Sequence, residues 1–300
     1  MTTRRLLFVH AHPDDEASKG AATAARQVDA GDEVVLVTCT GGEAGEVLND
    51  KHPPVAPDDL AAVREKELAE AVRIIGFQRS ELLGFPDSGF PDDPTDVDPM
   101  SFAGRDLDEV SRPLASILRR ERPHVVVTYP PDGGYPHPDH IRVHDATMRA
   151  VVLAADPTAD GVDGDPWDVP RTVFMAHFSI ARMEAMGEVY ASRGLDNPMA
   201  DWLERSRSAT TTRDADRVPE CHIDVVEWLD RRDDALRAHA TQVDPDGQWF
   251  AVPRDIEVEA FPWDTYVVLA GTPFPDGATD LFDGLGVTAD DQFGRAAVDR

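Results

Sequence analysis

Cysteine is scarce in this chain, and long apolar runs are missing. With only Cys39 and Cys221 among 300 residues, no disulfide framework can form, which favours a reducing, cytoplasmic setting. No apolar run approaches the ~18 residues of a membrane-spanning helix. The apolar residues 6–9 are followed at once by His10, so this run is too short for the core of a signal peptide. We therefore expect neither a membrane-spanning helix nor an export signal.

Positive charge is scarce as well. The 29 lysines and arginines face 57 aspartates and glutamates, giving a formal net charge of −28, and the lysines are Lys19, Lys51 and Lys66. Nucleic acids and anionic membranes are bound through cationic surfaces, so neither is an expected partner. A small molecule is the expected partner, and the sequence leaves the oligomeric state undetermined. The 41% of hydrophobic residues is enough to build the core of a large domain.

The chain does contain a regular alternation of strand-like and helix-like segments. Short apolar runs predict strands, and apolar residues spaced by about 3.6 positions predict helices between them. This alternation is typical of an α/β fold with a Rossmann-like, mostly parallel sheet and helices on both faces. Strands are predicted at 5–9, 33–39, 81–84 and 124–128, and helices at 18–29, 58–75, within 106–121 and at 138–154.

Two of these helices have candidate capping residues at their starts. Asp58 or Asp59 could cap the second helix. In the third helix Pro113 obscures the start, and Ser111 could be the cap.

Two polar clusters follow two of the predicted strands. The first is His10-Ala-His-Pro-Asp-Asp-Glu16, and the second is Tyr135-Pro-His-Pro-Asp-His140. Because ligands gather beyond the carboxyl ends of strands in such sheets, we expect the clusters to meet at one sheet edge. Imidazoles and carboxylates without nearby thiols suit zinc or another borderline divalent ion. Two histidines and one carboxylate would leave a coordination position open for water.

Such a site predicts hydrolysis of an amide. The metal lowers the pKa of its water toward about 7, and a neighbouring carboxylate takes the proton as the water attacks. The oxyanion and the leaving amine then need donors. Asp14, adjacent to the ligand Asp15, is placed for the role of base. His137, oriented by Asp139, is placed as the acid or as an electrostatic stabiliser.

The paired motif resembles that of the PIG-L/LmbE-like zinc N-deacetylases, firmly over the first 155 residues and loosely beyond. The resemblance implies one zinc ion per chain, with ferrous iron as an alternative. It implies the metal ligands His12, Asp15 and His140, the base Asp14, His137 as acid or oxyanion stabiliser, and Tyr135 as a mobile donor to the carbonyl oxygen.

Within that family the chain looks most like the amidases of mycothiol S-conjugates. Lys19 stands where the biosynthetic deacetylases carry a small hydroxyl residue, and the runs 133–142 and 238–242 also look like those of the amidases. The implied reaction cleaves the amide between glucosamine and an N-acetylcysteine that carries an S-linked group, which is a detoxification step. The alternative is removal of acetate from GlcNAc-inositol in mycothiol biosynthesis, or another PIG-L-type GlcNAc deacetylation.

Several further residues are candidates for binding substrate, each with a structural alternative. Lys19, Arg64, Glu43, Glu46 and Asp87 could contact polar groups of the substrate. Lys19 or Arg64 could instead lie solvated on a helix, Glu43 and Glu46 could brace their loop, and Asp87 could belong to a turn.

We expect the other histidines to support the site, to pack the fold, or to have no role that the sequence indicates. We expect His10 to be a second-shell or core residue and His144 to pack its helix, whereas His239, Thr241 and Gln242 could line the pocket. No role is expected for His52, His124, His177 and His222, and Cys39 is expected to be a small buried apolar residue.

The second half of the chain is set off by a Pro-, Asp- and Gly-rich break at 156–170. We expect residues 1–160 to form the metal-binding catalytic region, and residues 161–300 to complete the sheet and add a smaller substrate-facing lobe, in one continuous domain. This break and the loop at 86–104 are expected to shape specificity. In the second region the pattern predicts strands at 171–178 and 266–270, and a helix at 225–240 opened by a capping box of Asp224 and Glu227.

The sequence argues against two other classes of protein. A sugar-binding module without catalysis would not require the base Asp14 or the donors Tyr135 and His137. A dinucleotide-dependent oxidoreductase would need a G-x-G-x-x-G turn after the first strand, where this chain has His-Pro-Asp-Asp.

Overall fold

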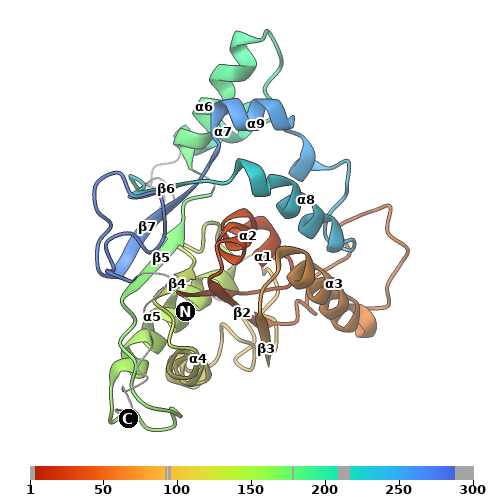
Figure 1. Ribbon diagram of the computed structural model, residues 1–300. Helices are drawn as coiled ribbons and strands as arrows, with labels where there is room; N and C mark the ends of the chain where they lie inside the picture. The colour runs from red at the N-terminus through yellow and green to blue at the C-terminus, as the bar shows by residue number, and fades with distance from the viewer. Residues whose placement is uncertain (1–3, 92, 94–95, 178, 209–216, 288–300) are drawn as a thin grey trace.

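The computed structural model describes residues 4–91, 93, 96–177, 179–208 and 217–287. In this part of the chain, seven strands form one sheet in the order β3-β2-β1-β4-β5-β7-β6 (Figure 1). The strands are β1 (Arg5–His10), β2 (Glu33–Thr40), β3 (Arg79–Phe85), β4 (Val125–Thr128), β5 (Arg171–Met175), β6 (Cys221–Asp224) and β7 (Trp263–Gly271).

The sheet is parallel except at one edge. β1 pairs in parallel with β2 and β4, β2 with β3, and β4 with β5, whereas β7 runs antiparallel to both β5 and β6. The chain leaves β1 toward β2 and β3 and then crosses back to β4 on the other side of β1. The direction of the strand order therefore reverses between β1 and β4, and doubly wound sheets bind ligands beyond the carboxyl ends of strands at such a point.

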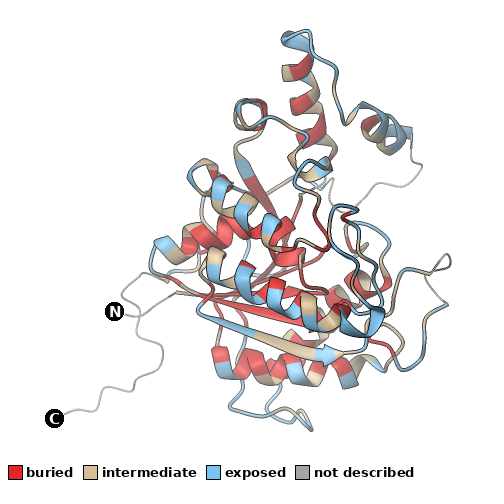
Figure 2. Cartoon of the chain, turned by 90° about the vertical axis from the view of Figure 1, so that its right-hand side faces the viewer, coloured by how far each residue is buried: buried red, intermediate tan, exposed pale blue. Residues whose placement is uncertain are grey.

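Helices cover both faces of the sheet. One face is covered by α2 (Ala21–Asp29), α3 (Leu60–Ile75) and α8 (Leu229–Ala238), and the other by α4 (Leu107–Glu121) and α5 (Pro138–Ala155). Side chains of a strand point alternately to the two faces, so Leu6 and Phe8 of β1 belong to the first core, and Leu7 and Val9 to the second. Figure 2 shows that the helices turn their buried residues toward the sheet.

Three helices form a smaller lobe above the β5–β7 edge in Figure 1: α6 (Ile180–Ser192), α7 (Ala200–Ser208) and α9 (Arg254–Ala260). The lobe has an apolar cluster of its own, centred on Met183, Met186 and Leu203. The expected smaller C-terminal lobe is therefore present. The single sheet takes β1 to β4 from the first half of the chain and β5 to β7 from the second.

Some element boundaries differ from the predictions. The helix predicted at 18–29 is divided into α1 (Asp15–Ser18) and α2, because Gly20 lies between them with φ 96°. A Cβ atom at Gly20 would lie 2.8 Å from the ring of Phe8, so the break also lets the chain approach the core closely.

Two predicted caps are wrong. The cap of α4 is Asp106, whose carboxylate accepts a hydrogen bond from the Glu109 amide at 3.2 Å, whereas Ser111 lies inside the helix and donates to the Leu107 carbonyl. The expected capping box at Asp224 does not form. The Asp224 carboxylate accepts from the Val226 amide, and a 3₁₀ turn, η3 (Val226–Trp228), precedes α8.

Two buried arginines hold irregular segments through backbone carbonyls. Arg119 of α4 donates to the carbonyls of Ala154 at 3.1 Å and Gly164 at 3.0 Å, which fixes the end of α5 and the break at 156–170. Arg171, fully buried at the start of β5, holds the segment after β7: its guanidinium donates to the carbonyls of Thr272, Pro273, Leu281 and Asp283 at 2.7 to 2.8 Å.

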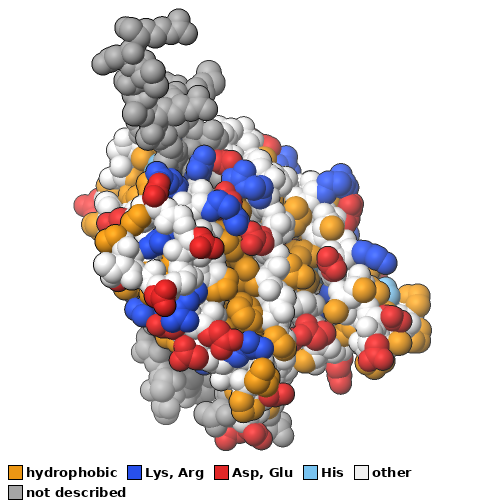
Figure 3. All heavy atoms as spheres, turned by 90° about the horizontal axis from the view of Figure 1, so that it is seen from below, with side chains coloured by type: hydrophobic (Ala, Val, Ile, Leu, Met, Phe, Trp, Pro, Cys, Tyr) orange, Lys and Arg blue, Asp and Glu red, His pale blue; other side chains and the backbone are white. Residues whose placement is uncertain are grey.

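The surface carries both signs of charge despite the acidic composition. Figure 3 shows basic and acidic side chains interspersed on the face seen from below Figure 1. Charges of opposite sign on the molecule can pair, and Arg149 of α5 donates to the Asp108 carboxylate of α4 at 2.6 Å. Among the described residues, no helix is both long and apolar enough to cross a membrane.

The remaining described elements are short. They are the 3₁₀ turns η1 (Pro57–Asp59), which leads into α3, and η4 (Gln248–Phe250), which follows α8.

Candidate active site

The loop from β1 to α1 is held in a strained conformation. Asp14 has φ 114°, a value that is sterically costly for a residue with a side chain. Arg64 of α3 holds this loop through its guanidinium group. Nη2 donates to the Pro13 carbonyl at 2.6 Å and lies 3.3 Å from Asp14 Oδ2. Nη1 donates to the Gly42 carbonyl at 2.8 Å. A Cβ atom at Gly42 would lie 2.2 Å from that nitrogen, so only glycine leaves room for Arg64.

The two polar clusters meet at the carboxyl edge of β1 and β4, as predicted. His12 Nδ1 lies 3.5 Å and His140 Nε2 3.4 Å from Asp15 Oδ2. One ligand atom from each of the three residues lies within 4.8 Å of the others, and all three residues are buried. His12 and His140 are far apart in the sequence, and the pairing of β1 with β4 brings them together.

The outward nitrogens of both imidazoles are held by acceptors. His12 Nε2 lies 3.3 Å from Asp139 Oδ2, and His140 Nδ1 lies 3.2 Å from the Gly133 carbonyl. A proton on each of these nitrogens leaves the lone pairs of His12 Nδ1 and His140 Nε2 directed toward Asp15. Metal-binding histidines are usually held in this way. The donor set and its supporting bonds therefore fit a divalent cation.

Asp139 has a different partner from the one predicted. In the described structure its carboxylate accepts from the Ser88 hydroxyl, from the Ser88 amide at 3.0 Å and from His12. His137 instead accepts, at Nδ1, from the Asp139 backbone amide at 3.1 Å. The expectation that the Asp139 carboxylate orients His137 is therefore wrong, because the turn that starts α5 points that carboxylate inward, to His12.

Two supporting residues were missed from the sequence. Ser88 follows β3 and fixes Asp139. Tyr129 follows β4; its ring stacks on His140 at 4.3 Å between centroids, and its hydroxyl lies 3.1 Å from the Ala11 amide. The hydroxyl also lies 3.2 Å from Nδ1 of His10, which is buried behind the site. The signal available was their position, one to three residues past a strand of the same edge.

Glu16 is supported from the second half of the chain. Its Oε1 lies 2.5 Å from His239 Nε2, with neither side chain exposed, and its Oε2 accepts from the Asp14 amide at 3.0 Å. His239 was expected to line the pocket, but it lies behind the metal-site loop. Thr241 donates to Glu67 of α3, and Gln242 donates to the Glu46 carbonyl.

The Asp14 carboxylate is half-buried beside the candidate ligands. Burial raises the pKa of this carboxyl group, and the nearby Asp15 charge adds to the effect, whereas Arg64 opposes it. A raised pKa makes a carboxylate a stronger proton acceptor.

Lys19 bridges the candidate metal site and its surroundings. Its Nζ atom lies 2.6 Å from Asp15 Oδ1 and 3.1 Å from Ser18 Oγ. Although burial raises the pKa of Asp15, Lys19 and His140 outweigh this effect and hold that pKa well below its usual value.

The other expected substrate-binding residues have structural partners. Glu43 accepts from the Asp87 amide at 2.8 Å, and Asp87 accepts from the Ala44 amide at 3.3 Å, so these two acids join the loops after β2 and β3. Asp87 Oδ1 also lies 3.7 Å from His12 Nε2. Arg64 is buried against the loop. Contacts of these residues with a substrate stay a prediction.

Aromatic rings form the mouth of the site. Tyr135 is 41% and Phe90 63% exposed, and Phe90 stacks on His137 at 5.3 Å between centroids. Tyr135 Oη lies 3.3 Å from His140 Nε2. Burial, together with the neighbouring His12 and His140, lowers the pKa of His137 to about 3. His144 lies outside this group and packs its helix, with Nδ1 2.8 Å from the Tyr129 carbonyl.

Two imidazoles and a carboxylate that could hold a metal ion, with a second carboxylate beside them, are suited to activating water for the hydrolysis of an amide. The chain belongs to the PIG-L family. The family model described as GlcNAc-PI de-N-acetylase matches residues 7–151.

Two curated relatives extend the similarity over most of the chain. The mycothiol S-conjugate amidase of Streptomyces coelicolor is 41% identical, covering 94% of this chain and 97% of its own. The 1D-myo-inositol 2-acetamido-2-deoxy-alpha-D-glucopyranoside deacetylase of Streptomyces avermitilis is 37% identical with the same coverages. The fold is also similar to that of the N,N'-diacetylchitobiose deacetylase of Pyrococcus horikoshii, with a TM-score of 0.61, 19% identity, and 89% of this chain and 84% of that one covered.

Proposed function

We propose that this enzyme is a zinc-dependent amidase that cleaves the amide between glucosamine and N-acetylcysteine in mycothiol S-conjugates. The observation that carries the proposal is the convergence of His12, Asp15 and His140 in a chain that is 41% identical to a mycothiol S-conjugate amidase over almost its whole length. The two cysteines are free and buried, which is compatible with the cytoplasmic setting that we infer.

Zinc suits the donor set. His12 Nδ1, Asp15 Oδ2 and His140 Nε2 would hold it, and three protein ligands leave a coordination position free, as catalytic zinc requires. When bound, the ion would lower the pKa of a water molecule and polarise the amide carbonyl. Ferrous iron accepts the same kind of ligands, so metal identity belongs to the test below.

The residues around the three ligands supply the proton transfers. Asp14 takes a proton from the attacking water as the C–O bond forms. The Tyr135 hydroxyl donates a hydrogen bond to the carbonyl oxygen as negative charge develops on it. The tetrahedral carbon then expels the glucosamine nitrogen, which receives the proton held by Asp14. The His137 ring, in contact with His12 and Phe90, provides a second donor at the mouth.

Lys19 supports the amidase over the deacetylase. Its ammonium group lies against the candidate ligand Asp15 at 2.6 Å, so it borders the space in which the acyl group of the substrate would lie. A small hydroxyl residue would leave that space neutral and open. An acyl group with amide and thioether functions can use an ammonium donor, whereas a bare acetyl group offers it only the reacting carbonyl.

The proposal is tested with the full chain after its metal content has been measured. Both candidate substrates, a mycothiol S-conjugate and GlcNAc-inositol, are offered separately, and the released amine is measured. We expect the larger kcat/KM for the S-conjugate. A larger value for GlcNAc-inositol would replace the amidase by the deacetylase, and inactivity of zinc- and iron-loaded protein toward both would reject the proposal.

A further inference from the structure

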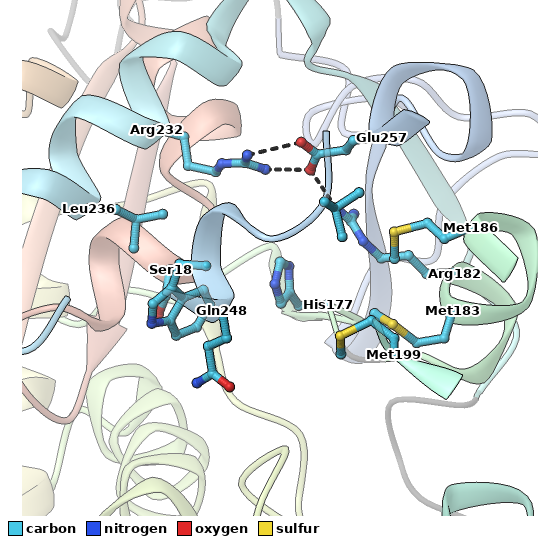
Figure 4. A pocket seen from close by; sticks show the side chains of 12 residues that line it. Ser18, His177, Arg182, Met183, Met186, Met199, Arg232, Leu236, Gln248 and Glu257 are labelled. Atoms are coloured by element: carbon cyan, nitrogen blue, oxygen red, sulfur yellow. Dashed lines mark hydrogen bonds and ion pairs between the residues drawn. The ribbon is translucent and has the colours of Figure 1, made fainter. Parts of the chain in front are cut away.

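A cavity of about 90 Å³ lies beside the candidate active site (Figure 4). Ser18 and Leu236 line it on one side, and α6 and the segment before α7 on the other, with His177 between them in this view. Its lining is largely apolar, from Met183, Met186, Met199, Leu236, Trp249 and Val252. Ligand sites are commonly built in this way, with an apolar lining and a few polar groups.

The charged groups that line this cavity form ion pairs. Glu257 accepts from Arg182 Nη2 at 2.9 Å and from Arg232 Nη1 at 2.7 Å, and Figure 4 shows these groups together along the upper wall. Arg232 also donates to Asp233 at 2.8 Å. Because both guanidinium groups already have carboxylate partners, the cavity favours an uncharged occupant over an anion.

Ser18 and Lys19, which are adjacent in the sequence, lie between the cavity and the candidate metal site. Ser18 lines the cavity and ends the short helix that Asp15 begins. Lys19 Nζ contacts both, at 3.1 Å from Ser18 Oγ and 2.6 Å from Asp15 Oδ1. Ser18 and Lys19 thus lie between Asp15 and the cavity, so a branch of a substrate bound at Asp15 that extends past Lys19 would be directed toward the cavity wall that Ser18 forms.

We propose that this cavity is the subsite for the apolar group that the substrate carries on its sulfur. The inference rests on the proposed amidase function, since the cysteine side chain is the branch that reaches past Lys19. Methionine side chains are flexible and polarisable, so three of them can repack around groups of different shape. We therefore expect the cavity to admit uncharged S-substituents of more than one shape.

The test compares two substrates that differ only at sulfur, the S-methyl and S-benzyl conjugates. Met186→Trp fills the cavity, and Met186→Leu keeps its volume as the matched control. We expect Met186→Trp to raise KM for the S-benzyl conjugate about tenfold or more, with the S-methyl conjugate changed less than about twofold. Met186→Leu, which keeps an apolar side chain of similar volume, should retain the wild-type ratio of kcat/KM between the two conjugates.

Each outcome separates the subsite from the function. If wild type cleaves the conjugates and Met186→Trp affects both equally, the subsite is wrong and the amidase stands. If wild type cleaves neither conjugate but deacetylates GlcNAc-inositol, the amidase itself is wrong.

A second variant covers the case in which Met186→Trp does not fold. Met186→Ala enlarges the cavity, and we expect it to improve kcat/KM for a bulkier S-naphthylmethyl conjugate relative to the S-methyl conjugate. Calorimetric binding of the product N-acetyl-S-benzylcysteine provides a readout without turnover. Unchanged affinity of Met186→Ala for this product, together with unchanged selectivity, would overturn the subsite.

Discussion

The carboxylate of Glu16 and the imidazole of His239 form a buried contact of 2.5 Å between positions 223 residues apart. Glu16 uses its other oxygen to accept from the amide of Asp14, the residue with positive φ. The contact therefore links the end of α8 to the loop that carries the proposed base and a candidate ligand.

We expect His239→Ala to lower the free energy of unfolding by about 3 kcal/mol or more, because it leaves a buried carboxylate without its partner. Turnover should fall as well, since Glu16 holds the Asp14 amide. Urea unfolding and steady-state kinetics measure the two effects. His222→Ala, which removes an exposed histidine from β6, is the control. Equal stability of the two variants would contradict this role.

The same contact predicts a pH dependence of stability. Burial lowers the pKa of His239, but the Glu16 charge outweighs burial and raises that pKa above its usual value. A group whose pKa is raised on folding stabilises fully below its unfolded pKa of about 6.5 and loses this contribution as pH rises through the folded value. The stability difference between wild type and His239→Gln should therefore shrink from pH 6.5 upward. A difference that grows with pH would contradict the assignment.

Asp139 should act on metal affinity, since it holds His12 and not His137. We expect Asp139→Asn to weaken zinc binding about 10- to 100-fold, and Asp15→Asn to weaken it more because a candidate ligand is lost. Competition with a chromophoric chelator measures both. Asp145→Asn, an exposed site on the same helix α5, should bind zinc like wild type. If Asp139→Asn does the same, the supporting role is wrong.

Asp14→Asn should reduce kcat by about 10² to 10⁴ while leaving KM and the zinc content near those of wild type. The amide keeps the size of the carboxylate but cannot take a proton. Asp59→Asn, exposed at the start of α3, is the matched control. Full turnover of Asp14→Asn would exclude Asp14 as the base.

Arg171→Met should destabilise the fold by about 3 kcal/mol or more, because the carbonyls that the guanidinium satisfies would lose their buried donors. The segment after β7 should also become open to proteolysis. Denaturant unfolding and limited digestion measure these effects against Arg73→Met, which removes an exposed arginine of α3. Resistance to digestion equal to that of wild type would show that other contacts hold the segment.

The sequence was sufficient to predict the elements that bring the two motifs together. β1 and β4 are short strands with apolar cores at 6–9 and 125–127, and a polar cluster follows each of them in the sequence. Neighbouring parallel strands end at the same edge. The convergence of His12 and His140 follows from that topology. Helices with a clear apolar period, such as α3 and α5, were also found close to their observed bounds.

Long-range partners could not be predicted in the same way. The position of Ser88 just after β3 places it near the site, but no pattern in the sequence pairs Ser88 with Asp139 or His239 with Glu16. These roles depend on which segments fold against each other. The edge strand β6 is only four residues long and is defined by pairing with β7, some forty positions later. Asp139 could face either His12 or His137, and only the start of α5 decides between them.

The Glu16–His239 contact has a consequence for dividing or recombining this chain. A fragment ending after α5 would contain every candidate ligand but would lack β5, β6 and β7. It would also lack His239, so the Glu16 carboxylate would have lost its imidazole partner. Chimaeras between relatives should therefore take Glu16 and His239 from the same parent, because the first half of the chain supplies the carboxylate and the second half supplies the imidazole.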